Sequence, residues 1–175
     1  MESMPTPPLF ARQPVFTASL SVFGHELLYR QALGSTQAVF ADMDAATLTV
    51  LAGAFQWQPG DLSGGQKIMV NFGRRTILDK APYALPAART VVQVDETVLL
   101  DDALLDVLRA LRAEGCMVAV NGFRARPEAQ GLLDVADIAV IDFLGSSPEE
   151  LAELLKPVQE RKIAAMAKKV EDAEA

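Results

Sequence analysis

Cysteine, histidine and basic residues are scarce in this chain of 175 residues, and long apolar runs are missing from it. The only cysteine is Cys116, so no disulfide framework exists within the chain and a reducing compartment is expected. The only histidine, His25, has no second histidine or cysteine at metal-ligand spacing, which favours a structural or exposed role. A zinc-stabilised or disulfide-stabilised fold is therefore not indicated.

Net charge and the length of the apolar segments argue against two further classes of partner, nucleic acids and membranes. The chain has 16 Lys and Arg against 23 Asp and Glu, a formal net charge of -7, whereas binding to nucleic-acid phosphates needs a basic face. No apolar segment approaches the roughly 20 residues that span a bilayer, and no basic, apolar leader is present. We expect a cytoplasmic protein that binds neither nucleic acid nor a membrane.

Apolar runs and turn signals predict a single α/β domain over residues 9–175, preceded by a flexible, proline-rich lead-in over residues 1–8. Strands are predicted over residues 9–16, 21–30, 67–72, 90–94, 116–120 and 138–141. Helices are predicted over residues 37–55, 73–79, 101–112 and from Ser147-Pro148 onward. The alanines of residues 162–170 favour a helix. Alternating strands and helices indicate parallel pairing with helices outside.

Two stretches near the N-terminus carry the most specific pattern. The first begins Ala11-Arg12-Gln13-Pro14, and the second contains Glu26-Leu27-Leu28-Tyr29-Arg30. A glutamate in such an apolar run indicates the rim of a sheet or a polar pocket. The second stretch resembles the Glu-Ala-Leu-Leu-Arg signature that ends a strand in the EAL domain, the cyclic di-GMP phosphodiesterase fold. The first resembles the subgroup in which an HDOD domain follows the EAL domain.

The resemblance covers nearly the whole chain and implies a TIM-like (β/α) barrel of the EAL type. A complete barrel takes about 250 residues, with about 200 as a lower bound, so 175 residues are few for one. The resemblance also stops near the end of the family's penultimate strand, which makes residues 162–170 a strand in the family pattern. We therefore expect a barrel truncated before its last strand, whose open end is a candidate surface for homo-oligomerisation.

The resemblance also assigns the positions of a two-metal site, in which carboxylates at the strand ends hold the cations. Glu26 and Asn71 match metal ligands of the family. The next strand of the family carries two glutamates. Here Gln93 stands at the metal-ligating position and only Glu96 remains.

The positions that follow depart further from the family. Asn121 and Gly122 replace both aspartates of the Asp-Asp-Phe-Gly motif, Val140 replaces a lysine, and Lys168 replaces the general-base glutamate. A neutral amide cannot supply the anionic bridge between two cations. We expect Glu26, Asn71, Gln93, Asn121 and Val140 to point into one mouth. The whole vestigial pocket comprises Glu26, Asn71, Gln93, Glu96, Asn121, Gly122, Val140, Asp142, Lys168 and Glu171.

Three functions remain open from these residues. The first is a catalytically inactive EAL-like domain that binds a protein in a bacterial signalling pathway and needs no Mg²⁺ or Mn²⁺. The second is a receptor that binds cyclic di-GMP without hydrolysing it, with Arg30 at the position of the family's phosphate-contacting arginine. The third is an active phosphodiesterase, which would need amides as metal ligands and a different base.

Two surface features bear on this choice. Arg74-Arg75 and Arg124-Ala125-Arg126 follow strands, so they either form a small basic rim at the mouth or are solvated loop charge. The acidic helix over residues 148–155 offers Glu149, Glu150 and Glu153 to a basic partner, although such a run is more commonly a solvated face.

Overall fold

The computed structural model describes residues 10–29, 44–45, 47–48, 51 and 65–170, and in these residues one curled sheet of seven strands runs in sequence order. The first two strands form an antiparallel hairpin, and every later neighbour pairs in parallel. The strands are β1 (Phe10–Phe16), β2 (Val22–Tyr29), β3 (Lys67–Asn71), β4 (Thr90–Asp95), β5 (Met117–Asn121), β6 (Ile138–Asp142) and β7 (Ala164–Lys168).

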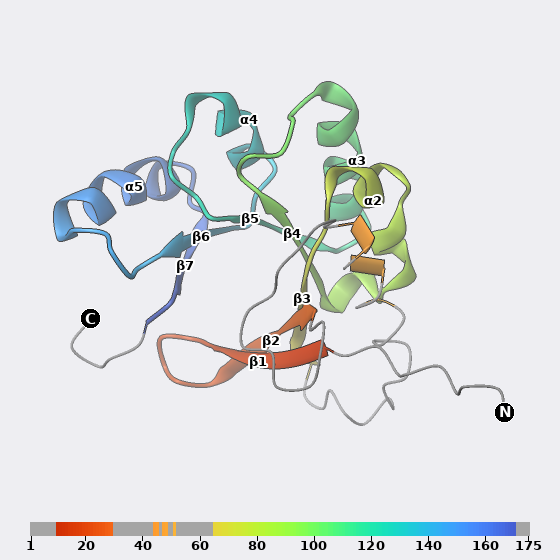
Figure 1. Ribbon diagram of the computed structural model, residues 1–175, viewed down its shortest axis with the longest axis horizontal. Helices are drawn as coiled ribbons and strands as arrows, with labels where there is room; N and C mark the ends of the chain where they lie inside the picture. Colours follow the sequence, from red (N-terminus) through yellow and green to blue (C-terminus); the bar gives the residue numbers. More distant parts are fainter. Residues whose placement is uncertain (1–9, 30–43, 46, 49–50, 52–64, 171–175) are drawn as a thin grey trace, which may run out of the picture.

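Helices cover the outer face of the parallel strands (Figure 1). They are α2 (Arg74–Leu78), α3 (Asp102–Ala113), α4 (Gln130–Leu133) and α5 (Pro148–Glu160), with 3-10 turns at Ala81–Ala84, Ala87–Arg89 and Pro127–Ala129. Local sequence sets where the two longer helices begin. The Asp101 carboxylate accepts from the Leu104 N–H, and Ser147 with Glu150 forms a reciprocal capping box before α5.

The core has two apolar layers, one on each face of the sheet. The outer layer packs the strands against the helices, and α3 contributes Leu104, Leu108 and Leu111, all fully buried at helical spacing. The inner layer comprises Met69, Val91, Ala119, Ile138 and Val140, with Val15, Phe23, Met117 and Met166 packed against it. The inner layer lies inside the curl of the sheet, next to the C-terminal strand ends that carry the polar residues.

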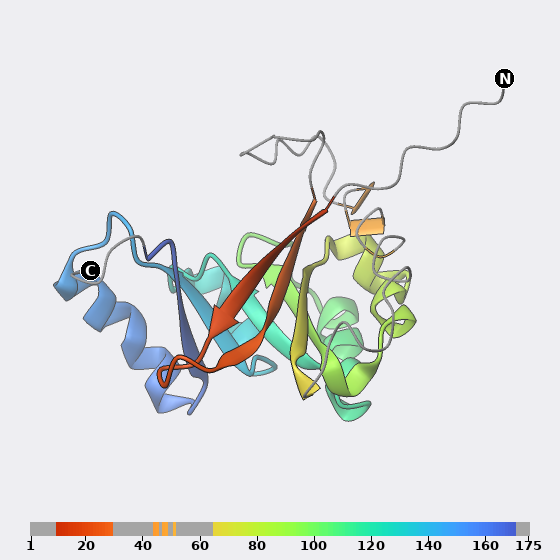
Figure 2. The same cartoon turned by 90° about the horizontal axis from the view of Figure 1, so that it is seen from below.

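The curl brings the two ends of the sheet toward each other without joining them. Each of β1 and β7 pairs with a single neighbour among the described residues. The β1–β2 hairpin crosses the open side of the curl opposite β7 (Figure 2). The described residues thus form an open α/β barrel of seven strands, which confirms the predicted barrel-type fold. No helix in the described ranges is long and apolar enough to cross a membrane.

Most of the predicted elements match the structure within one or two residues, and the differences have physical causes. Of the two alternatives for residues 162–170, the structure contains the strand of the family pattern and not the helix, because the ladder with β6 outweighs the helix propensity of the alanines. The short helix α4 was not predicted, since four residues give no readable periodicity. The predicted helix over residues 37–55 and the lead-in over residues 1–8 fall mainly outside the described residues.

Candidate functional site

The parallel register brings the candidate site residues to one face of the sheet. Side chains of paired residues in neighbouring strands share a face, and along each strand the faces alternate. Glu26 pairs with the inward-facing Met69, and Asn71 pairs with Gln93. Asn121 follows the inward-facing Ala119 by two residues on β5. These residues therefore share the inner face of the sheet with Val140 of the inner apolar layer.

A chain of polar contacts crosses this mouth from β7 to β5. The Lys168 ammonium lies 3.0 Å from Oε1 of Glu26, with which it forms an ion pair. The Asn71 amide Nδ2 donates to the same Glu26 oxygen at 3.4 Å, and Nδ2 of Asn121 donates to Oδ1 of Asn71 at 3.3 Å. Four of the sequence-predicted positions are thus linked in series by these contacts.

The ion pair between Lys168 and Glu26 is the electrostatic centre of the site. Glu26 is 2% exposed, and a carboxylate so far removed from water needs a compensating charge. The Lys168 side chain is 26% exposed and supplies that charge from the opposite end of the sheet. The two residues are 142 positions apart in the chain, so the pair also ties β2 to β7 across the open side of the curl.

Gln93 is the fully buried amide of the site. Neither its amide oxygen nor its amide nitrogen has a hydrogen-bond partner within the described residues. Buried polar groups are normally hydrogen-bonded, so the Gln93 amide is an unusual buried polar group on the inner face of the sheet. At this position the side chain is neutral and contributes no negative charge.

Glu96 holds a loop and does not take part in the polar chain across the mouth. Its carboxylate accepts from the backbone N–H of Arg124 and from that of Arg126, each at 3.0 Å, and also pairs with the Arg126 guanidinium at 3.5 Å. The Glu96 side chain is almost fully buried by these contacts. This structural role was missed from the sequence, because the loop that it anchors begins 28 residues later.

The other predicted positions are distributed around the mouth. Asp142 pairs with Lys169 at 2.7 Å, and Val140 is fully buried in the inner apolar layer. Gly122 adopts a φ of 66°, the left-handed conformation that glycine favours in the turn after β5. Arg30 and Glu171 lie outside the described residues.

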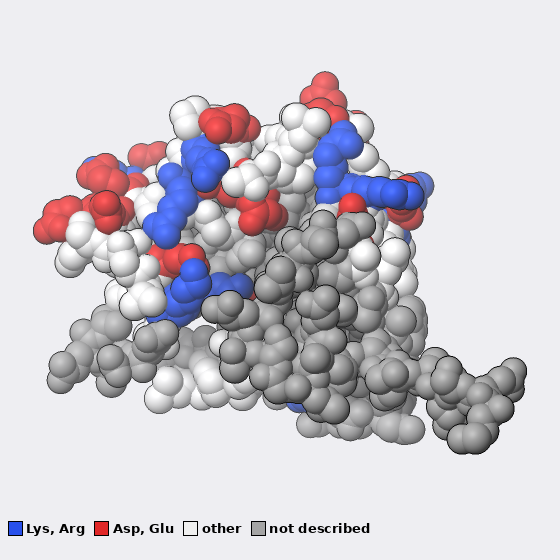
Figure 3. Space-filling view, in the orientation of Figure 1, with Lys and Arg blue, Asp and Glu red and all other residues white. Residues whose placement is uncertain are grey.

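The arginines that were considered as a basic rim are engaged with protein groups. Arg74 pairs with Asp101 and donates to the Leu99 carbonyl at 3.2 Å, while Arg75 lies 3.6 Å from Asp79. Arg124 donates to the Ser146 hydroxyl at 2.9 Å. Basic and acidic side chains are interspersed on the side of the molecule where α4 and α5 lie (Figure 3). The solvated, paired interpretation of these charges fits the structure better than a free basic rim.

The two remaining reactive residue types are the buried Cys116 and the half-buried His25. Burial raises the pKa of the Cys116 thiol, which keeps it protonated. Burial lowers the pKa of His25, and the positive charge of Arg12 lowers it further. No group of three or more His, Cys, Asp or Glu side chains in the described part of the chain could hold a metal ion.

Two curated proteins are similar to this chain in sequence. The Vibrio cholerae cyclic di-GMP phosphodiesterase CdgJ is 24% identical over 147 residues, and the Bacillus subtilis protein YuxH is 30% identical over 169 residues. These matches cover 83% and 92% of this chain but 34% and 41% of the two proteins. The chain therefore spans less than half the length of these relatives. No family model matches it.

Solved structures show the same architecture. The EAL domain of Xanthomonas citri FimX, solved in complex with cyclic di-GMP, matches with a TM-score of 0.72 at 19% identity. The match covers 96% of this chain and 79% of that chain.

Proposed function

We propose, from the premise that this chain has the fold of an EAL domain, that it is a catalytically inactive regulatory domain in bacterial cyclic di-GMP signalling that acts by binding a protein. The fold alone does not determine an activity, so the proposal depends on the chemistry of the mouth. The HDOD domain that the N-terminal pattern implies stays a prediction about a longer protein.

The observation that carries the proposal is the ion pair between Lys168 and Glu26. A two-metal phosphodiesterase needs its carboxylates free to bind cations, which polarise the phosphate and activate water. Here an ammonium group already neutralises the buried Glu26 carboxylate at 3.0 Å. A divalent cation would have to displace a lysine that the fold itself positions, and would suffer repulsion from it.

The other positions support the same conclusion. Asn71, Gln93 and Asn121 carry neutral amides, so they give oxygen donors without the negative charge that holds two cations close together. The side chain at the family's general-base position is the Lys168 ammonium, which cannot accept a proton from water. The residues of the mouth therefore do not fit a two-metal centre, and we propose that the domain binds neither Mg²⁺ nor Mn²⁺ there.

The test is hydrolysis of cyclic di-GMP by the purified chain in the presence of Mn²⁺ or Mg²⁺, with separation of the linear dinucleotide by chromatography. We expect no product above the buffer control. Glu26→Gln tests the mouth, and Glu160→Gln, at an exposed position on α5, is the matched control. Product formation that Glu26→Gln abolishes and Glu160→Gln preserves would refute the proposal.

Binding of cyclic di-GMP without hydrolysis is the second candidate function. It is favoured by the amides of the mouth, because fewer carboxylates there repel a dianionic ligand less strongly. The FimX EAL domain was solved with this ligand bound. Titration calorimetry with cyclic di-GMP, with and without Mg²⁺, decides between the candidates. Micromolar binding that Arg30→Ala abolishes would replace the protein-binding proposal by the receptor function.

We place the protein-binding surface at the N-terminal half of α5. Glu149, Glu150 and Glu153 line a hollow of about 610 Å³ together with Arg124 and Leu154. A basic segment of a partner would find complementary charge there, although Glu150 also closes the capping box and Glu153 pairs with Lys156. The Glu149→Lys variant should weaken capture of such a partner, whereas Glu160→Lys should not.

A further inference from the structure

The hollow of about 610 Å³ beside α5 is bordered by charges of both signs. On the helix it is lined by Glu149, Glu153 and Pro157, which are spaced four residues apart and therefore share one face. The loop that follows β5 contributes Arg124 and Ala125. The hollow thus has carboxylates on the helix and a guanidinium on the loop.

Contacts within the chain hold both of these elements in place. The Glu96 carboxylate accepts from the backbone N–H groups of Arg124 and Arg126, which fixes the loop. The capping box of Ser147 with Glu150 fixes the start of α5. Because its walls are already ordered, the hollow can receive a ligand at a small cost in conformational entropy.

Two charges at the hollow have no partner of opposite sign within the described residues. Arg124 pairs with no carboxylate there, and its Nη1 donates to the Ser146 hydroxyl at 2.9 Å instead. Glu149 forms no ion pair in this part of the chain, whereas Glu153 pairs with Lys156. Both Arg124 and Glu149 are exposed. A ligand that carries a negative and a positive group can therefore satisfy both residues at once.

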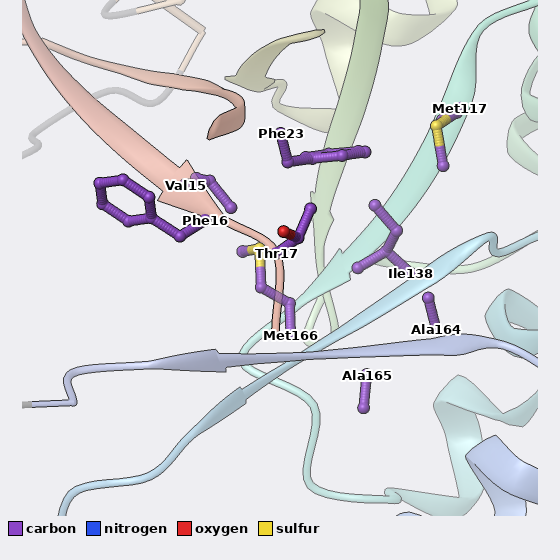
Figure 4. Close-up of a pocket in the computed structure, with 9 residues that line it drawn as sticks. All are labelled: Val15, Phe16, Thr17, Phe23, Met117, Ile138, Ala164, Ala165 and Met166. Atoms are coloured by element: carbon purple, nitrogen blue, oxygen red, sulfur yellow. The ribbon is translucent and has the colours of Figure 1, made fainter. Parts of the chain in front are cut away.

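The lining of the hollow also contains apolar side chains. Leu154 and Pro157 are half-buried there, so they can pack against the aliphatic part of a long basic side chain. The smaller cavity between the β1–β2 hairpin and β7, of about 210 Å³, has a different character (Figure 4). Its side chains are apolar except for the Thr17 hydroxyl, so it offers no charge to a ligand.

We propose that the hollow beside α5 binds the C-terminal end of a partner protein whose last residue is arginine or lysine. The terminal carboxylate pairs with the Arg124 guanidinium, whose planar group can donate two parallel hydrogen bonds to it. The basic side chain pairs with Glu149, and its aliphatic stem lies on Leu154 and Pro157. A terminal basic residue carries both charges, and capture of a chain end is a recurring mode of peptide recognition.

The inference rests on the proposed role in protein interaction and names the segment that is recognised. It is tested with the full chain by fluorescence anisotropy of a short labelled peptide that ends in arginine with a free carboxylate. A second peptide has the same sequence and a C-terminal amide. We expect saturable binding of the free acid and about tenfold weaker binding of the amide, because the amide lacks the charge that pairs with Arg124.

Two variants assign the charges of the peptide to their partners. Arg124→Ala keeps the backbone N–H that Glu96 binds, and it should weaken binding of the free acid about tenfold without affecting the amide. Glu149→Gln should weaken both peptides, because both carry the arginine side chain. Arg109→Ala on α3 and Glu160→Gln at the end of α5, both at exposed positions, are the matched controls and should change neither. Circular dichroism spectra confirm that the variants fold.

Four results would overturn the inference. The first two are the absence of saturable binding and an Arg124→Ala variant that binds the free acid as tightly as the wild type. Equal binding of acid and amide would assign the hollow to an internal basic segment. Free L-arginine that competes as well as the unlabelled peptide would assign it to a small molecule. None of the variants alters the polar chain across the mouth, so the hydrolysis assay and the peptide assay can fail independently.

Discussion

Replacement of Lys168 by methionine tests the electrostatic centre of the site. Methionine keeps an apolar chain of similar length but removes the ammonium that lies 3.0 Å from Oε1 of Glu26. Among the described residues, the buried Glu26 carboxylate then keeps only the Asn71 amide as a side-chain hydrogen-bond partner. Breaking a fully buried ion pair costs about 3–5 kcal/mol, because a buried charge is left uncompensated.

The partial exposure of Lys168 lowers the expected loss of stability below that of a fully buried pair. Its side chain is 26% exposed, so water compensates part of the loss, and we expect Lys168→Met to lower the free energy of unfolding by about 2–3 kcal/mol. For a domain of this size that corresponds to a decrease in Tm of roughly 4–12 °C. The assay is thermal unfolding followed by circular dichroism near neutral pH.

The neighbouring lysine provides the matched control. Lys169 also forms an ion pair, with Asp142, but its side chain is 55% exposed, and such pairs contribute about 0–1 kcal/mol. Lys169→Met should therefore change Tm little. The double variant Glu26→Gln/Lys168→Met removes both charges and should recover part of the loss. If Lys168→Met and Lys169→Met lowered Tm by the same small amount, the buried ion pair would not have the role assigned to it.

Three further predictions concern stability and reactivity. Burial and the charge of Arg12 lower the pKa of His25, so below pH 6.5 the unfolded chain binds more protons than the folded chain. The free energy of unfolding should therefore fall as the pH is lowered below that value. Urea titrations at several pH values should show that His25→Gln flattens this pH dependence. Leu108→Ala should cost about 2–5 kcal/mol in urea unfolding, and equal loss from the exposed Leu99→Ala would contradict the assigned core. The Cys116 thiol, with its pKa raised by burial, should react with iodoacetamide far more slowly in the folded chain than in urea, and equal rates would refute its burial.

Local signals in the sequence predicted most of the fold. The short apolar runs gave the strands, and Ser147-Pro148 gave the start of α5, because caps and periodicity are determined by neighbouring residues. The strand over Ala164–Lys168 could not be derived from its alanines. It depends on the ladder with β6, so only the family resemblance indicated it.

The site was predictable in its residues but not in its contacts. The resemblance placed Glu26, Asn71 and Asn121 at one mouth, since parallel strands end at a common edge. The sequence already showed Lys168 at the position where the resemblance implies the general-base glutamate. That its ammonium binds the remaining Glu26 carboxylate depends on how far the sheet curls, which no local pattern encodes. The contact by which Glu96 holds the loop at Arg124 could not be predicted either, because it also depends on the tertiary fold.

We propose that the Lys168 ammonium takes the place of a metal cation at Glu26. Binding of Mn²⁺ to the purified chain, followed by the electron paramagnetic resonance signal of the free ion, tests it most directly. We expect the wild type and Glu26→Gln to leave the same free-ion signal, with no saturable binding that depends on Glu26. Saturable Mn²⁺ binding by the wild type that Glu26→Gln abolishes would contradict the claim.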